Sequence, residues 1–299
     1  MSDPTHFFGT ADTEIKLSLV REYLETYTKA LRGKFRRLWY FDAFAGTGTW
    51  SVKIPGKEAD FLTEGYPERV EQRRGSATIA IDIEPRFDKI FLMDALPKHV
   101  AALMALREAH SDRDILVLAG DANKLIPDAL RAADWRSTRA VMFLDPYGMQ
   151  VEWETLQAIA NTKAVDVWYL FSLSGLYRQA ARNIEAVDPT KRRALTRMLG
   201  TDAWEQELYS SVDQGQHDIF SGLEQPEIRQ RHADVAGLEA YVRRRLLTIF
   251  PLVLEPFALP VRRRPQLFSL FFAVSNDDPR ALGLARKFGS HILKRGISS

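Results

Sequence analysis

Hydrophobic and polar residues follow two different periods along this chain, and each period predicts its own type of element. Residues 13–31 place apolar side chains near one face of a helix, namely Ile15, Leu19, Leu24 and Tyr27. Charged residues, Lys16 among them, lie largely off that face. This spacing predicts an amphipathic helix, and Asp12 or Thr13 can cap its start.

Short apolar runs alternate with further helical patterns from residue 38 onward. Nearly continuous apolar runs, typical of strands buried on both faces, cover 38–44, 89–94, 114–118, 139–144 and 166–171. Helical patterns cover 76–83, 97–109, 124–132 and 153–160. This alternation predicts a parallel sheet with helices on both faces and right-handed crossovers.

Two stretches interrupt this alternation. Residues 51–74 are polar and punctuated by Gly and Pro, so we expect a loop or insertion there. Residues 175–248 are polar, rich in Arg and helical by pattern, so we expect a helical insertion that recognises a substrate or a partner. The main domain would then comprise 1–174 and 249–299.

The C-terminal part returns to strand patterns. Segments 250–259 and 266–274 look like strands, and the residues between them leave no room for a helix. Such neighbours form an antiparallel hairpin, which we expect at one end of the sheet. A last helix is expected after residues 277–279, because Pro279 suits a first helical position.

The composition narrows the functional classes. The chain has 299 residues and no cysteine, which excludes disulfides, cysteine nucleophiles and iron–sulfur clusters. Its start lacks the features of a signal peptide, and no apolar run approaches the roughly 18 residues of a membrane helix. We therefore expect a soluble, cytoplasmic protein. The net charge of +2 does not by itself indicate a large nucleic-acid footprint.

Carboxylates mark successive strand ends of the predicted sheet. They are Asp42, Asp94, Asp121 and Asp145. Ligands of open α/β sheets bind beyond the carboxyl ends of the strands, so four carboxylates on one edge predict a ligand with several donors. Gly46 and Gly48 permit a tight turn after the first strand, although the loop is neither a P-loop nor a complete dinucleotide fingerprint.

Each strand end also has a structural alternative. Asp94 can accept the two hydroxyls of an adenosine ribose, or it can cap the following helix. Asp121 can accept from an adenine amino group while the Ala122 amide donates to the ring, or it can form a turn. Asp145 and the Pro146 carbonyl can orient an amino nucleophile while Tyr147 stacks on a flat substrate, or they can form a sharp turn.

Basic clusters offer a weaker signal. Arg262, Arg263 and Arg264 lie in the turn of the predicted hairpin, where they can contact the phosphates of a nucleic acid. Residues 243–245, also three arginines, lie on a predicted helix and are more typical of a solvated face. The six histidines show no metal-binding spacing, so no metal site is expected.

Several motifs in order along the chain resemble those of class I S-adenosylmethionine-dependent methyltransferases. They are Phe-Asp-Ala-Phe-Ala-Gly-Thr-Gly at 41–48, Met-Asp at 93–94, Gly-Asp-Ala-Asn at 120–123 and Leu-Asp-Pro-Tyr-Gly at 144–148. In more detail, the N-terminal helix with Lys16, the Gly-Ser-Ala step at 75–77, the Asp-Pro-Tyr-Gly turn and Ser-Gly-Leu at 174–176 resemble the three-Cys-motif partner (TcmP) family of bacteria and phages. This resemblance covers about 1–180 and extends more loosely to the end. The resemblance implies a Rossmann-like, mostly parallel seven-stranded sheet whose last strand is antiparallel. It also implies a partner protein with a three-cysteine motif, similar to radical S-adenosylmethionine proteins.

The resemblance assigns S-adenosylmethionine as cofactor and S-adenosylhomocysteine as product. The residues that would hold them are Asp42, Phe44, Ala45, Gly46, Gly48, Asp94, Ala95, Asp121 and Ala122. Asp145, Pro146 and Tyr147 would be catalytic. Amino-directed methyltransferases usually carry Asp/Asn-Pro-Pro-Tyr/Phe, whereas the aromatic ring here comes one position early, at Tyr147.

Three functions remain open at this point. The first is a methyltransferase acting on an amino group of a nucleic acid or a similar planar substrate. The second is a non-catalytic or partner-dependent cofactor-binding subunit of the three-Cys-motif protein. The third, a nicotinamide oxidoreductase, is disfavoured by the incomplete glycine fingerprint and by the distance of Asp94 from the glycines.

Overall fold

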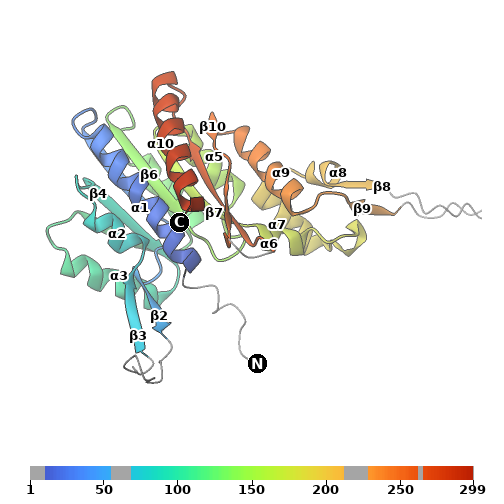
Figure 1. Cartoon of the computed structure of the whole chain (residues 1–299), viewed down its shortest axis with the longest axis horizontal. Helices are drawn as coiled ribbons and strands as arrows, with labels where there is room; N and C mark the ends of the chain where they lie inside the picture. The colour runs from blue at the N-terminus through green and yellow to red at the C-terminus, as the bar shows by residue number, and fades with distance from the viewer. Residues whose placement is uncertain (1–10, 55–68, 212–227, 262–264, 299) are drawn as a thin grey trace, which may run out of the picture.

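A computed structural model describes residues 11–54, 69–211, 228–261 and 265–298, and shows one mostly parallel central sheet (Figure 1). Its strands are β1 (Arg37–Asp42), β4 (Lys89–Asp94), β5 (Ile115–Ala119), β6 (Thr138–Leu144), β7 (Val165–Ser172), β10 (Leu252–Val253), β11 (Phe257–Leu259) and β12 (Phe268–Val274). They lie in the order β10-β12-β7-β6-β1-β4-β5, and β11 also pairs with β12. Strand β1 therefore occupies an interior position, parallel to β4 and β6 on either side.

The C-terminal strands close one end of the sheet in antiparallel fashion, as predicted. Strand β12 pairs antiparallel with β7 on one side and with β10 and β11 on the other. The seven strands expected become eight, because the predicted strand 250–259 is divided into β10 and β11. Pro256 lies between the two and has no N–H to donate to a ladder, which accounts for the break.

Helices cover both faces of the sheet, and each face has its own apolar cluster. One face carries α1 (Ala11–Leu31), α2 (Ser76–Asp82), α3 (Pro97–Ala109) and α10 (Pro279–Ser298). The other carries α4 (Ala122–Arg131), α5 (Trp153–Asn161), α7 (Pro189–Leu199) and α9 (Val235–Leu247). Neighbouring residues of β1 alternate between the clusters: Tyr40 joins the first and Phe41 the second.

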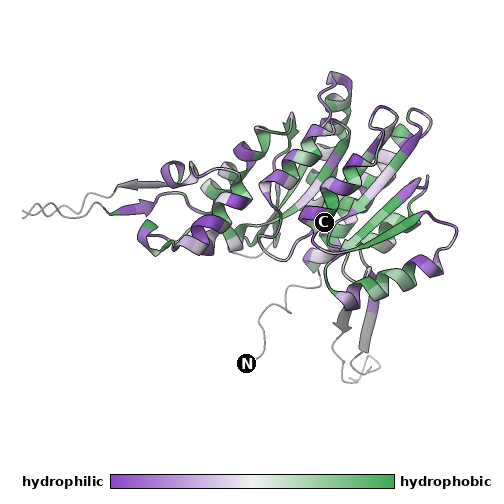
Figure 2. Cartoon of the chain, turned by 180° about the vertical axis from the view of Figure 1, so that it is seen from behind, coloured by the Kyte–Doolittle hydropathy of each residue, from purple (hydrophilic) through white to green (hydrophobic). Residues whose placement is uncertain are grey.

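The hydropathy of the ribbon follows this layering. Figure 2 shows apolar residues concentrated in the central strands and polar residues along the helices. This is the pattern expected when a parallel sheet is covered on both faces. No helix in the described part of the chain is long and apolar enough to span a membrane.

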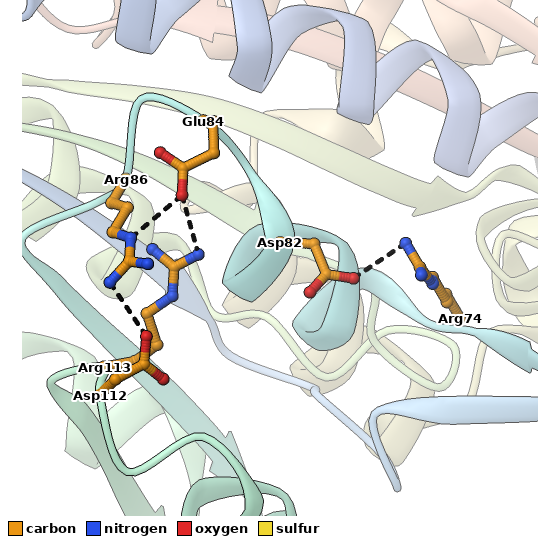
Figure 3. A network of polar contacts seen from close by, with 6 residues as sticks. All are labelled: Arg74, Asp82, Glu84, Arg86, Asp112 and Arg113. Atoms are coloured by element: carbon orange, nitrogen blue, oxygen red, sulfur yellow. Dashed lines mark hydrogen bonds and ion pairs between the residues drawn. The ribbon is translucent and has the colours of Figure 1, made fainter.

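Of the loop or insertion predicted at 51–74, the loop is wrong for the residues that the structure describes there. Strands β2 (Thr49–Ile54) and β3 (Arg69–Arg74) form an antiparallel hairpin outside the central sheet (Figure 1). Trp50 and residues 52 and 54 are apolar and alternate with polar ones, a two-residue period that signals a strand. Arg74 pairs with Asp82 of α2 at 2.9 Å (Figure 3), and Arg73 pairs with Glu14 of α1, so the hairpin is fastened to two helices.

A second charged network lies at the opposite edge, before β4 and β5. Glu84 accepts from Arg86 at 3.0 Å and from Arg113 at 3.3 Å, and Arg86 also reaches Asp112 at 3.0 Å (Figure 3). Exposed ion pairs of this kind contribute little to stability individually. Their effect is to join the two turns that lead into neighbouring strands, away from the edge where Asp42 and Asp94 end their strands.

The described part of segment 175–248 is mostly helical, as expected, but it also contains a hairpin. It comprises α6 (Leu173–Gln179), η2 (Ile184–Ala186), α7, α8 (Trp204–Glu207), β8 (Tyr209–Ser211), β9 (Arg229–Arg231) and α9. Buried residues of this segment, such as Leu195 and Trp204, share one apolar cluster with the central sheet. Whether the segment is a separate domain stays a prediction.

Two of the three arginines of α9 do not form the solvated face that their spacing suggested, whereas Arg244 is exposed and pairs with Glu207 at 3.4 Å. Arg243 donates to the carbonyl oxygens of Val253 and Leu254 at 3.1 and 3.3 Å. Arg245 donates to the carbonyl oxygen of Leu199 at 3.1 Å and lies over the Trp153 ring. These side chains attach α9 to its neighbours, because main-chain carbonyls at the ends of β10 and α7 need donors.

Candidate functional site

Four carboxylates lie at the carboxyl edge of the central sheet. Asp42 and Asp94 end β1 and β4, while Asp121 and Asp145 lie just beyond β5 and β6. Because these four strands are parallel, their carboxyl ends share one edge, with β1 between β4 and β6. The β2–β3 hairpin and α6 also lie at this end of the sheet (Figure 1).

The loop after β1 folds onto the end of β4. Ala45 donates its N–H to the Met93 carbonyl at 2.9 Å, and Gly46 donates its N–H to Asp94 Oδ2 at 3.0 Å. Gly46 and Gly48 have φ values of 59° and 76°, a region that favours glycine. A Cβ on Gly46 would meet open space, whereas one on Gly48 would lie 2.8 Å from a side-chain atom of α3. The loop is thus closely packed at Gly48 and open at Gly46.

A third glycine, which the sequence pattern did not single out for this role, seats the loop on α2. A Cβ on Gly75 would lie 2.7 Å from the Gly48 carbonyl oxygen. That oxygen accepts from the Gly75 N–H at 2.9 Å and from the Thr78 hydroxyl at 2.7 Å. The backbone of the loop therefore approaches the start of α2 as closely as only glycine allows.

Asp94 holds two neighbouring backbones together. Besides the Gly46 N–H, it accepts the N–H of Leu96, the N-cap residue of α3, at 2.8 Å. His99 Nδ1 lies 3.1 Å from its Oδ1, and the residue is 8% exposed. An ionised carboxylate has about four acceptor positions, so a ligand hydroxyl can still be accepted. Ala95 is exposed beside it, and Leu96 is 45% exposed, an unusual position for a large apolar side chain.

Asp121 caps α4 and remains exposed. Its Oδ1 accepts the Asn123 N–H at 2.9 Å, as the turn-forming alternative predicted. Ala122 is buried. Asn123, which the sequence pattern did not single out, donates to the Gln150 carbonyl at 2.8 Å and accepts the Glu152 N–H at 3.0 Å. It ties the end of β5 to the turn after β6.

That turn presents Asp145, Pro146 and Tyr147 in three different ways. Asp145 is partly exposed and pairs with Lys16 of α1. Pro146 is buried, and among the described residues no hydrogen bond reaches its carbonyl oxygen. Tyr147 is 73% exposed, and its N–H donates to Gln150 Oε1 at 3.0 Å. Gly148, with a φ of 74°, reverses the chain immediately after the ring.

Lys16 corrects the prediction for the first helix, which placed this residue off the apolar face. It is buried together with Leu19, Val20 and Tyr23, on the side of α1 that faces the sheet. Its spacing of three, four and seven residues from them is the helical period, so the pattern contained the signal. A buried ammonium requires a partner, and Asp145 supplies it.

Asp42 is the most perturbed carboxyl of this edge. It is 0% exposed, and burial raises its pKa to about 7. A hydrogen bond from Ser76 and the charge of Lys16 act in the opposite direction, while the charge of Asp145 raises the pKa further. No hydrogen bond in the described structure reaches its Oδ1. Lys16 therefore acts on two carboxyl groups, because it pairs with Asp145 and its charge lowers the pKa of Asp42.

The remaining predicted residues divide into placed and unplaced ones. Phe44 is half-buried and Ala45 buried in the loop after β1. Arg262, Arg263 and Arg264, predicted to contact substrate, lie outside the described residues. The edge thus combines a glycine loop, the buried carboxyls of Asp42 and Asp94, the more accessible ones of Asp121 and Asp145, and two exposed apolar side chains, Leu96 and Tyr147.

Comparison with known proteins bears on the fold alone. No protein-family model matches the sequence, and neither does a curated protein. Protein LPL1258 from Legionella pneumophila (family DUF519) has a similar structure, with a TM-score of 0.50 and 13% identity over 95% of this chain and 94% of its own. Because the two sequences are only 13% identical, this likeness shows a shared fold and nothing more.

Two further solved structures are more distant. The N-terminal domain of EvdMO1 with S-adenosylhomocysteine bound gives a TM-score of 0.38 and 12% identity over 91% of this chain and 84% of its own. An S-adenosylmethionine-dependent methyltransferase from Clostridium acetobutylicum gives 0.37 and 8% over 88% and 92%. Scores this low carry no argument about the site. The strand order and the antiparallel last strand establish the predicted Rossmann-like class I methyltransferase fold; membership of the TcmP family stays a prediction.

Proposed function

We propose that this chain is an S-adenosylmethionine-dependent methyltransferase that acts on an amino group of a planar substrate, such as a nucleobase. The observation that supports this most is the contact between the loop after β1 and the end of β4, where Gly46 donates to Asp94 at 3.0 Å. It brings a glycine loop and a carboxylate together beyond the carboxyl ends of adjacent parallel strands, which is where ligands of such sheets bind.

The residues at this edge fit the parts of the cofactor. Asp94 retains acceptor positions for ribose hydroxyls, and the exposed side chain of Leu96 offers an apolar surface to a purine ring. The exposed carboxylate of Asp121 suits an amino group of that ring. The open side of Gly46 leaves room for the amino-acid end. The bound cofactor supplies the electrophilic methyl group.

The turn after β6 suits an amine as acceptor. Asp145 and the Pro146 carbonyl can accept the two N–H bonds of an amine, which directs the nitrogen lone pair toward the methyl group. Lys16 fixes the orientation of Asp145 from the helix side. The exposed ring of Tyr147 provides a face on which a planar substrate stacks.

Calorimetric titration with S-adenosylmethionine tests the cofactor assignment. We expect wild type to bind and Asp94→Asn to bind about 10- to 100-fold more weakly, the effect of losing charge-assisted hydrogen bonds. Asp112→Asn, at the opposite edge of the sheet, is the matched control and should bind like wild type. Absence of binding to wild type would refute the proposal, and equal binding by Asp94→Asn would remove Asp94 from the site.

A second candidate is a partner-dependent subunit that binds the cofactor and works with a three-Cys-motif protein. The pair between Asp145 and Lys16 favours it, because an incoming amine must share a carboxylate that already has a buried partner. Transfer of labelled methyl groups to RNA or DNA by the isolated chain, abolished in Asp145→Asn, would exclude this candidate. Activity that appears only with added three-Cys-motif protein would support it.

A further inference from the structure

Helix α6 carries an exposed aromatic ring next to the turn that holds Asp145. The helix begins directly after β7, and a Cβ on Gly175 would lie 3.3 Å from Met149, so α6 packs against that turn. Tyr177 of α6 is 46% exposed. Together with Tyr147, it is one of the few large apolar side chains that the described surface exposes.

An arginine lies against one face of the Tyr177 ring. The guanidinium of Arg231, in β9, is 4.1 Å from the ring centroid. Two contacts hold it there: the side chain donates to the Ala233 carbonyl, and the Arg231 N–H donates to the Arg182 carbonyl at 2.7 Å. The ring is therefore supported from one side by a fixed cation, and its exposed surface is available to a second planar group.

Two more cations follow Tyr177 closely along the chain: Arg178 is the next residue of α6, and Arg182 lies just beyond the helix. Arg178 and Arg182 are both exposed, and no acidic group among the described residues lies within ion-pair distance of either. Nearby arginines differ, since Arg192 pairs with Glu205 and Arg197 pairs with Glu152. A positive charge without a carboxylate partner among the described residues is available to an external anion.

We propose that Tyr177, Arg178, Arg182 and Arg231 form a track for single-stranded nucleic acid next to the amine-accepting turn. This inference rests on the proposed function and names its substrate class. A planar group that stacks on Tyr177 and anionic groups that meet Arg178 and Arg182 are the two chemistries of a nucleotide chain. A strand rather than a duplex is required, because bases paired and stacked within a helix cannot lie on a protein ring.

Binding of fluorescein-labelled RNA and DNA strands of about 12 nucleotides, a length within single-strand site sizes, tests the track by anisotropy. We expect strands to bind more tightly than the matching duplexes, and the RNA and DNA arms distinguish the two sources. Tyr177→Ala should weaken binding about 5- to 100-fold and Tyr177→Phe should not, because stacking needs the ring and not the hydroxyl. Arg178→Gln and Arg182→Gln should each reduce the slope of log affinity against log salt by about 0.7.

Arg286→Gln, an exposed arginine on α10, is the matched control and should change neither quantity beyond the general loss of one charge. Equal binding by Tyr177→Ala and wild type, an unchanged salt slope in both arginine variants, or tighter binding of duplex would overturn the track. The same samples are titrated with S-adenosylmethionine. Cofactor binding without strand binding refutes the track alone, whereas strand binding without cofactor binding refutes the proposed methyltransferase and leaves a strand-binding surface.

Discussion

The buried carboxyl of Asp42 should make the protein less stable as the pH rises, and Asp42→Asn should abolish that contribution. Burial raises the pKa of Asp42 from 3.8 to about 7 in the folded chain. Between these two values the folded state binds a proton that the unfolded chain releases. The contribution of neutral Asp42 to the free energy of unfolding is therefore fully present below about pH 4 and is lost as the pH rises toward about 7.

The magnitude follows from the size of the shift. One pKa unit corresponds to about 1.4 kcal/mol, so ionising Asp42 in the folded chain costs about 4 kcal/mol at alkaline pH. Between about pH 5 and pH 8, the expected change is about 2.5 kcal/mol. Asparagine has nearly the same shape and does not ionise. Burying the amide lowers the stability of the variant, because no hydrogen-bond partner reaches the position of Oδ1 in the described structure. That loss of stability does not depend on pH.

Urea denaturation followed by circular dichroism at about pH 5 and about pH 8 provides the measurement. The free energy of unfolding of Asp42→Asn minus that of wild type should increase by about 2.5 kcal/mol between the two pH values. Burial also raises the pKa of Asp166 to about 7, but Asp166 is present in both proteins, so its contribution cancels in the difference. Asp112→Asn, at an exposed carboxylate, is the control and should track wild type. A difference that stays constant with pH would refute the argument that Asp42 is buried as a neutral acid.

Three further substitutions test other contacts of the site and the fold. Lys16→Met should lower the melting temperature more at about pH 8 than at about pH 5, because the charge of Lys16 lowers the pKa of buried Asp42 and its removal makes the ionised form of that carboxyl more costly; an equal drop at both pH values would contradict this. Gly48→Ala should lower the free energy of unfolding in urea titrations by about 1–3 kcal/mol more than Gly46→Ala. Both positions have a left-handed backbone, but only a Cβ at Gly48 also meets a side chain, so equal losses would show that the packing around Gly48 is loose. Gly200→Ala places a Cβ 2.0 Å from an indole ring and should cost more than either, so a melting temperature close to wild type would contradict the described helix end.

Much of the fold was predictable because its elements are regular and deeply buried. The boundaries of β4 and α3 match the predicted ranges 89–94 and 97–109, since continuous apolar runs and helical spacing are local properties. The antiparallel end of the sheet was predictable from the short distance between two strand patterns. The β2–β3 hairpin was missed because it lies outside the central sheet, so its polar residues hid an alternation that only Trp50 and two neighbours carry.

The sequence by itself determined which carboxylates share an edge, because parallel strands in a row must end on the same side. It could not determine their partners. Lys16 meets Asp145 across 129 residues, and Asn123 reaches the turn after β6 across 27. The support of Tyr177 by Arg231 likewise joins α6 to a strand that follows a long intervening segment. Such contacts depend on how helices pack on the sheet. Because that packing results from many weak apolar contacts over the whole chain, only the tertiary structure decided which cation lies beside which acid or ring.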